Sequence, residues 1–188
     1  MSWSKDFVQS MGYSPLEEMP KGDNLVYKAY GDEGIVVAKI AIDSRGHSDL
    51  CFERDRLERN QDLDWVPRMY LFRDYLPGTE EGERILSGFR REGHVINNPA
   101  ILIKSFLPGI PLERTPGKKL NPSQYQAVLS QVKTLHGRID AGLDIGARNV
   151  LVQSQRKATL FDLGPSRHKR TFGAHRRDDL KKLDDLKK

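Results

Sequence analysis

Apolar residues in the first half of the chain come in short runs that predict β-strands. Leu25-Val26-Tyr27 and the run from Ile35 to Ile42 are separated by the turn Gly31-Asp32-Glu33-Gly34, and Ala100 to Ile103 forms a third run. Short runs rich in β-branched residues and bounded by glycine are typical of strands. The stretch from Trp65 to Tyr70 is also strand-like, so this half predicts a small sheet.

Helical spacing appears in three other segments. Ser48-Asp49 is expected to cap a helix carrying CFERDRLERNQ. Asn121 and Pro122 suit the start of the longest helix, as N-cap and first-turn proline. Its apolar stripe consists of Tyr125, Val128, Leu129, Val132 and Leu135. A final helix carries Leu180, Leu183 and Leu186. Residues 77–94 are expected to form a helix or a loop insertion, and residues 1–18 a short helix or an arm.

The strongest chemical signal lies at one end of a predicted β-hairpin. Val150-Leu151-Val152 and the run from Ala158 to Phe161 are joined by a short polar link. Asn149 directly precedes the first strand and Asp162 directly follows the second, so an antiparallel pairing brings them to the same end. Asp144 lies on the loop just upstream. Two carboxylates and a carboxamide form a hard oxygen site that suits Mg²⁺ and phosphate.

Lys39 is the one charged side chain in the run from Ile35 to Ile42. By the two-residue period of a strand it shares a face with Val37 and Ala41. An unpaired ammonium group in an apolar layer costs several kcal/mol, so Lys39 requires an anionic partner or access to a cleft. Two interpretations follow: an edge strand from which Lys39 extends to water, or a functional lysine.

Composition and charge add few constraints. The 188 residues are 37% hydrophobic and 30% charged, which suffices for one core, divided if necessary between two small lobes. The single cysteine, Cys51, excludes an internal disulfide and fits a reducing compartment. No apolar run suggests a bilayer span or a signal peptide. Much of the net charge of +5 lies in Arg84 to Arg91 and in Arg167 to Arg177; the first is interpreted as solvated surface and the second as facing the predicted site.

Three short motifs resemble the protein-kinase superfamily. DIGARN, which begins at Asp144, is similar to the kinase catalytic loop, and DLG, which begins at Asp162, is similar to the metal-binding DFG. VVAKI, around Lys39, resembles the VAIK strand. One position departs from the pattern, because Gly142 stands where the catalytic loop normally carries a scaffold histidine.

The resemblance implies a role for each motif residue. Asp144 would orient the acceptor hydroxyl and accept its proton, with Arg148 close enough to steady the transferring group. Asn149 and Asp162 would hold the metal ion. Lys39 would grip the nucleotide phosphates.

The remaining contacts follow from the same resemblance. Glu53 lies on the helix after the Lys39 strand and is expected to pair with Lys39, whereas its rival Glu58 sits on a different face. Gly22 lies in the turn expected over the phosphates, where glycine-rich loops usually carry more than one glycine. The hinge whose main chain would bind adenine comprises Lys104, Ser105, Phe106 and Leu107.

The implied fold is α+β and bilobal. It has one domain, residues 1–188, with a small antiparallel N-lobe sheet over about residues 1–104 and a truncated, mainly helical C-lobe over about residues 108–188. An acidic residue at the start of the last helix, Asp178 or Asp179, is expected to tie down the catalytic loop. The short segment after DLG resembles the compact, atypical branch of the superfamily, which includes RIO and Bud32 kinases and minimal bacterial effector kinases.

The predicted function is transfer of the γ-phosphate of ATP, with Mg²⁺, to a Ser or Thr hydroxyl of a protein substrate. Such an enzyme would be cytoplasmic or secreted into a host cytosol, where an activating or host partner is compatible with it. A small-molecule kinase of the aminoglycoside or lipopolysaccharide type is one alternative. A pseudokinase is another, motivated by Gly142 and the single-glycine turn. A nucleic-acid-binding module is disfavoured because aromatic and basic residues are not interleaved.

Overall fold

The computed structural model describes residues 2–19, 24–76, 78–94, 98–138, 140–165 and 172–188. The chain divides into two units. The N-terminal unit comprises residues 1–61 and 67–106, and the C-terminal unit comprises residues 62–66 and 107–188. Gly22 and residues 167–171 of the second basic cluster lie outside the described residues.

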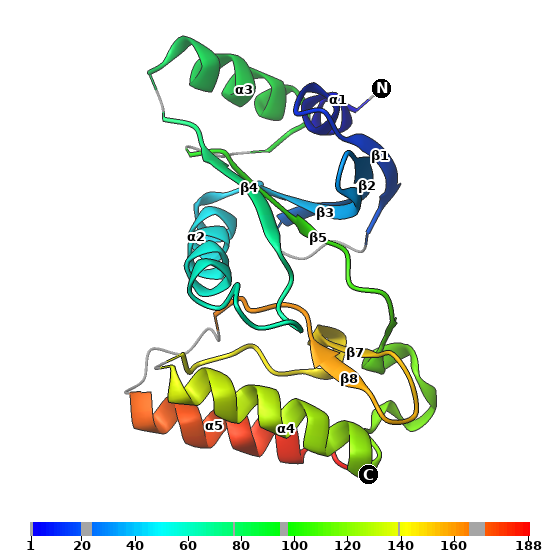
Figure 1. Cartoon of the computed structure of the whole chain (residues 1–188). Helices are drawn as coiled ribbons and strands as arrows, with labels where there is room; N and C mark the ends of the chain where they lie inside the picture. The colour runs from blue at the N-terminus through cyan, green and yellow to red at the C-terminus, as the bar shows by residue number, and fades with distance from the viewer. Residues whose placement is uncertain (1, 20–23, 77, 95–97, 139, 166–171) are drawn as a thin grey trace. The chain divides into compact units, whose positions relative to one another are not determined.

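An antiparallel sheet is the centre of the N-terminal unit (Figure 1). Its strands are β1 (Ser14–Glu18), β2 (Asn24–Gly31), β3 (Gly34–Ala41), β4 (Met69–Asp74) and β5 (Ala100–Ser105), and the helices of the unit are α1 (Trp3–Ser10), α2 (Ser44–Arg59) and α3 (Glu80–Arg91). The strand order is β1-β2-β3-β5-β4. β3 therefore has a neighbour on each side, so the edge-strand interpretation of Lys39 is wrong.

α2 begins earlier than the sequence suggested. Asp43 is its N-cap, and its carboxylate accepts a hydrogen bond from the Gly46 main-chain N–H at 2.6 Å. Ser48 and Asp49, the predicted cap, lie inside the helix. Gly46 lies in the first turn of the helix, where its N–H is the group that the Asp43 side chain caps.

β4 also differs from its prediction, because it begins at Met69 rather than at Trp65. Pro67 has no N–H to donate to a ladder, and the Val66 N–H bonds to the Leu63 carbonyl at 3.1 Å in a turn. Residues 77–94, which the sequence left open between helix and loop, contain α3. The side chain of its N-cap, Thr79, accepts from the Gly82 N–H at 3.1 Å.

α1 packs against α3 through aromatic rings. The Trp3 ring stacks on Phe7 at a centroid distance of 5.2 Å and meets Phe89 edge-on at 4.8 Å. Gly88 of α3 makes this approach possible, because a Cβ there would lie 2.0 Å from the Trp3 ring. Glu92, the C-cap of α3, accepts hydrogen bonds from the Ser2 hydroxyl at 2.7 Å and from the Ser4 N–H. The first residues of the chain are therefore part of the N-terminal core.

Within its described residues, the C-terminal unit has two helices and a small three-stranded sheet, with three short 3₁₀ turns. The helices α4 (Pro122–Gly137) and α5 (Phe172–Asp184) lie side by side (Figure 1). The strands are β6 (Ile110–Pro111), β7 (Val150–Val152) and β8 (Ala158–Leu160), and the turns are η1 (Leu112–Arg114), η2 (Pro116–Lys118) and η3 (Ala147–Asn149). The predicted hairpin is confirmed, with Val150 opposite Leu160 and Val152 opposite Ala158.

α4 begins as predicted and supports the hairpin with polar groups as well as with its apolar stripe. The Asn121 side chain accepts from the Gln124 N–H at 3.0 Å and Gln124 bonds back to the Asn121 N–H, which completes a capping box. Gln131 accepts from the Leu160 N–H at 3.0 Å. It also donates to the Ala158 carbonyl at 3.4 Å, so one buried amide bonds to two residues of β8.

Residues 62–66 belong with the C-terminal unit, although the sequence assigned them to the N-terminal lobe. Both terminal nitrogens of Arg138 bond to the Asp62 carboxylate, at 2.5 and 2.7 Å. This bidentate pair lies at the end of α4. None of the helices in the described parts of the chain has the length and apolar character needed to cross a bilayer.

Candidate active site

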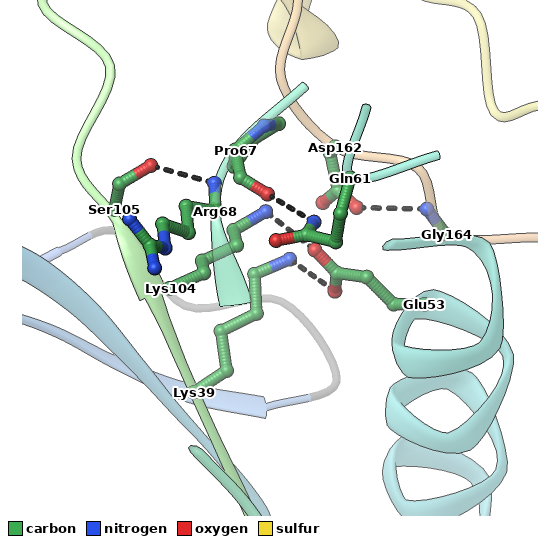
Figure 2. Close-up of polar contacts among 9 residues, drawn as sticks. All are labelled: Lys39, Glu53, Gln61, Pro67, Arg68, Lys104, Ser105, Asp162 and Gly164. Carbon is green, nitrogen blue, oxygen red and sulfur yellow. Dashed lines mark hydrogen bonds and ion pairs between the residues drawn. The ribbon is translucent and has the colours of Figure 1, made fainter. Parts of the chain in front are cut away.

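The N-terminal unit contains a buried cluster of two lysines and one glutamate. Lys39 Nζ lies 2.7 Å from Glu53 Oε2, and Lys104 Nζ bonds to the other carboxylate oxygen, Oε1. Figure 2 shows the two lysines reaching the same carboxylate from neighbouring strands, β3 and β5. The side chain of Lys39 is 10% exposed, and those of Glu53 and Lys104 are 2% exposed. The helix carboxylate expected for Lys39 is therefore present.

Sequence reasoning missed the side chain of Lys104. Lys104 pairs with Val37 in the sheet, two residues along β3 from Lys39, so the period of two brings both lysines to the same face of adjacent strands. The signal that could have revealed it is a lysine directly after the apolar run Ala100 to Ile103, within the same strand. Glu53 offers one negative charge to two ammonium groups.

The predicted hinge from Lys104 to Leu107 is partly sheet. Lys104 lies inside β5, with Val37 and Met69 opposite it on the two sides. The Ser105 N–H donates to the Arg68 carbonyl at 2.7 Å, and the Phe106 N–H donates to the Ile35 carbonyl at 3.2 Å. The geometry thus does not support adenine binding through these two N–H groups, since both already complete the sheet. The Ser105 hydroxyl also accepts from the Arg68 N–H at 2.9 Å (Figure 2).

In the C-terminal unit, Asp144 and Asn149 are joined by direct hydrogen bonds. Asn149 Nδ2 donates to the Asp144 main-chain carbonyl at 2.7 Å and to its carboxylate at 3.0 Å. Arg148 Nη2 lies 2.8 Å from the same carboxylate oxygen. The Asn149 Oδ1, the atom of that side chain that suits a metal ion, takes no part in these bonds.

Asp162 is held at the same end of the hairpin by main-chain bonds on either side of it. The Phe161 N–H donates to the Asn149 carbonyl at 3.2 Å, and the Asp144 N–H donates to the Gly164 carbonyl at 3.4 Å. Asp162 Oδ1 accepts from the Gly164 N–H at 3.0 Å (Figure 2). The three oxygen-bearing residues of the predicted site therefore come from neighbouring segments of one unit.

Asp179 anchors the predicted catalytic loop. This carboxylate is fully buried, and it accepts the Gly142 N–H at 2.9 Å and the Leu143 N–H at 3.0 Å. His136 Nε2 lies 3.0 Å from it. Of the two acidic residues considered, Asp179 makes these bonds, from within α5 rather than from its start, whereas Asp178 is half-buried.

The backbone conformation of this loop explains why position 142 is a glycine. Its φ of +75° is one that side chains rarely adopt, and a Cβ would lie 2.9 Å from His175 Nδ1. A histidine at this position would therefore be strained. His136, at the end of α4, bonds to the anchoring carboxylate instead, so the loop is tied down without a histidine of its own.

Each cluster, taken within its own unit, has side chains of a defined chemical type. Carboxylate and amide oxygens, as at Asp144, Asn149 and Asp162, are the ligands that Mg²⁺ prefers. Ammonium groups, as at Lys39 and Lys104, form charge-assisted bonds to phosphate oxygens. Gly22, the residue proposed to lie over the phosphates, is outside the described residues.

Comparison with known proteins supports the architecture. No protein-family model and no curated protein matches the chain. Among solved structures, it is similar to the kinase PK-1 of Cydia pomonella granulovirus, with a TM-score of 0.57 and 16% sequence identity. The match covers 86% of this chain and 57% of the viral kinase, so this chain spans little more than half of that protein's length. At this identity the likeness concerns the fold alone: the chain has a protein-kinase-like α+β fold.

Proposed function

We propose that this chain is an ATP- and Mg²⁺-dependent phosphotransferase, a minimal atypical protein kinase that phosphorylates Ser or Thr hydroxyls of a protein. The observation that carries the proposal is the buried pair of Lys39 and Glu53, at 2.7 Å, between an inner strand of a small sheet and the helix that follows it. Burying such a charge pair is costly. A functional explanation for this buried pair is that Lys39 binds an anionic ligand.

Each of the two clusters is assigned its own part of the proposed chemistry. Lys39, oriented by Glu53, would hold the α- and β-phosphates. Asp162 and the Asn149 Oδ1 would hold Mg²⁺, which when bound neutralises charge that develops on the phosphates. The kinase-like fold of the chain supports this arrangement.

Asp144 would act on the acceptor. Its carboxylate would accept the proton of the substrate hydroxyl while the hydroxyl oxygen forms a bond to the γ-phosphorus. The bond from that phosphorus to the β–γ bridging oxygen breaks, and ADP leaves with the bonding electron pair. Arg148, 2.8 Å from the Asp144 carboxylate, and Asn149 fix its orientation. Asp179 acts only through the loop and is a positioning residue.

Nucleotide binding and transfer are tested separately. In a thermal-shift titration, Mg-ATP should raise the Tm of the wild type, because a ligand that binds only the folded state stabilises it. Asp162→Ala should abolish transfer from labelled ATP and reduce the shift. Asp185→Ala, which removes an exposed carboxylate from the same unit, should change neither. Full activity in Asp162→Ala would refute the metal assignment, and binding without any transfer would indicate a pseudokinase.

The acceptor requires its own experiment. Labelled ATP is incubated with a whole-cell extract and either wild type or Asp162→Ala, and labelled products are separated by size and hydrolysed to phosphoamino acids. A protein band that carries phosphoserine or phosphothreonine and depends on Asp162 supports a protein kinase. Label confined to small molecules would contradict the protein acceptor while leaving the phosphotransferase proposal intact.

A further inference from the structure

A second group of potential ligands lies in the N-terminal unit, apart from the lysine cluster. His47 and Cys51 are four residues apart on α2, so they share one face of the helix, and Asp74 is the last residue of β4. His47 Nε2 lies 3.1 Å from Asp74 Oδ1 and 3.9 Å from the Cys51 sulfur. One ligand atom from each of the three side chains falls within 4.8 Å of the others.

These distances are close to the spacing of ligand atoms around a tetrahedral zinc ion. Zinc bonds of about 2.0–2.2 Å to nitrogen or oxygen and about 2.3 Å to sulfur place tetrahedral ligand atoms about 3.3–3.6 Å apart. The Nε2 to Oδ1 distance of 3.1 Å and the Nε2 to Sγ distance of 3.9 Å bracket that range. The third edge, from the Cys51 sulfur to the Asp74 carboxylate, is no longer than 4.8 Å. Side-chain movements of up to about 1 Å would therefore bring the three ligand atoms to tetrahedral spacing.

The ligand types select the metal. One thiol, one imidazole and one carboxylate combine a soft, a borderline and a hard donor, which suits Zn²⁺ and not Mg²⁺ or Ca²⁺, whose ligands are oxygens. The site is also reachable from solvent, because the His47 and Asp74 side chains are 17% and 39% exposed. Three protein ligands with solvent access leave a fourth tetrahedral position for water or another donor.

We propose that His47, Cys51 and Asp74 form a zinc site that clips the first half of α2 to the end of β4. This site is independent of the proposed nucleotide chemistry, which uses other residues. Burial raises the pKa of the Cys51 thiol, and the Asp74 carboxylate raises it further, although Arg54 opposes this. The ion therefore displaces a proton when it binds. Since Glu53 lies two residues after Cys51, zinc would stabilise the same helix that holds Lys39.

Cobalt is the spectroscopic probe of this site. The full chain is freed of metal with a chelator and titrated with Co²⁺ in the absence of nucleotide. Because Cys51 is the single cysteine of the sequence, a thiolate-to-cobalt charge-transfer band in the near ultraviolet can arise from this residue alone. We expect the band to saturate at one Co²⁺ per chain, to disappear on addition of one equivalent of Zn²⁺, and to be absent in Cys51→Ser.

Ligand variants decide whether the three residues act together. His47→Gln and Asp74→Asn should each weaken Co²⁺ binding at least about tenfold. Glu58→Gln, which removes an exposed carboxylate elsewhere on α2, should leave it unchanged. Saturating Zn²⁺ should raise the Tm of wild type and Glu58→Gln by about 3 °C or more and raise that of Cys51→Ser by less than 1 °C. Absence of the band, or equal Co²⁺ affinity in wild type, His47→Gln and Asp74→Asn, would overturn the proposal, since binding would then involve the cysteine alone or nothing.

Discussion

Replacing Glu53 and Lys104 one at a time should reduce the stability of the N-terminal unit by very different amounts. Both side chains are 2% exposed, and both belong to the cluster that includes Lys39. Glu53→Gln leaves two buried ammonium groups without the carboxylate that they share. Lys104→Met removes one of the two positive charges with a side chain of similar length, and it leaves the opposite charges of Lys39 and Glu53 paired.

The magnitudes follow from the cost of buried charge. Removing one partner of a buried ion pair destabilises a protein by about 3–5 kcal/mol, and we expect Glu53→Gln to fall in this range. Lys104→Met should cost less than about 1.5 kcal/mol, because methionine fills the space and no charge loses its partner within the cluster. In the double variant, with Glu53→Gln and Lys104→Met together, only Lys39 faces the new amide. The double variant should therefore lose about 1–3 kcal/mol less unfolding free energy than the two single variants lose in sum.

The N-terminal unit can be followed on its own. The sequence has two tryptophans, and Trp3 lies in the N-terminal unit whereas Trp65 belongs to the C-terminal one. In a Trp65→Phe background, urea unfolding followed by fluorescence therefore reports the free energy of unfolding of the N-terminal unit. If Lys104→Met costs as much as Glu53→Gln, or if the two costs add in the double variant, the shared-carboxylate account is wrong.

Three further predictions concern other parts of the fold. Gly88→Ala should destabilise the N-terminal unit by about 1–3 kcal/mol in the same denaturation assay, because its methyl group would overlap the Trp3 ring. Asp179→Asn should cost about 3 kcal/mol, measured by calorimetry, because an amide cannot accept all the bonds that this buried carboxylate accepts. Burial alone would raise the pKa of Glu92, but hydrogen bonds from the serines at the start of α1 outweigh it and lower the pKa. Its stabilisation is therefore present above the usual pKa of 4.5 and lost as the pH falls below it, so the difference in unfolding free energy between wild type and Glu92→Gln should shrink between about pH 6 and pH 3.

The parts of the site that the sequence predicted are those in which neighbouring residues determine the geometry. Asn149 and Asp162 flank two short strands, and a hairpin necessarily brings its outer ends together. Lys39 was recognisable because a charge inside an apolar strand requires a partner, and Glu53 lies on the next helix. The fold class followed from the order of such motifs, and the likeness to a viral kinase confirms it.

The parts that the sequence missed depend on contacts between distant segments. α1 has little pattern of its own, and its role becomes clear only when Trp3 packs over Gly88, far along the chain. Lys104 was assigned to the hinge, but it lies in β5, which pairs with both β3 and β4. This strand order differs from the order of the strands along the chain. Periodicity alone does not identify which strands become neighbours.

The predicted catalytic loop, residues 142–149, illustrates how such long-range contacts change the interpretation of a motif. By motif, Gly142 marks a missing scaffold histidine and favours a pseudokinase. In the structure this position has a φ of +75°, and the buried Asp179 bonds to the loop N–H groups and to His136 from a different helix. The scaffold is therefore present in a rearranged form, and the departure at Gly142 no longer argues against activity. Catalysis by this chain would depend on Asp144, Asn149 and Asp162, whose oxygens would contact the reacting groups.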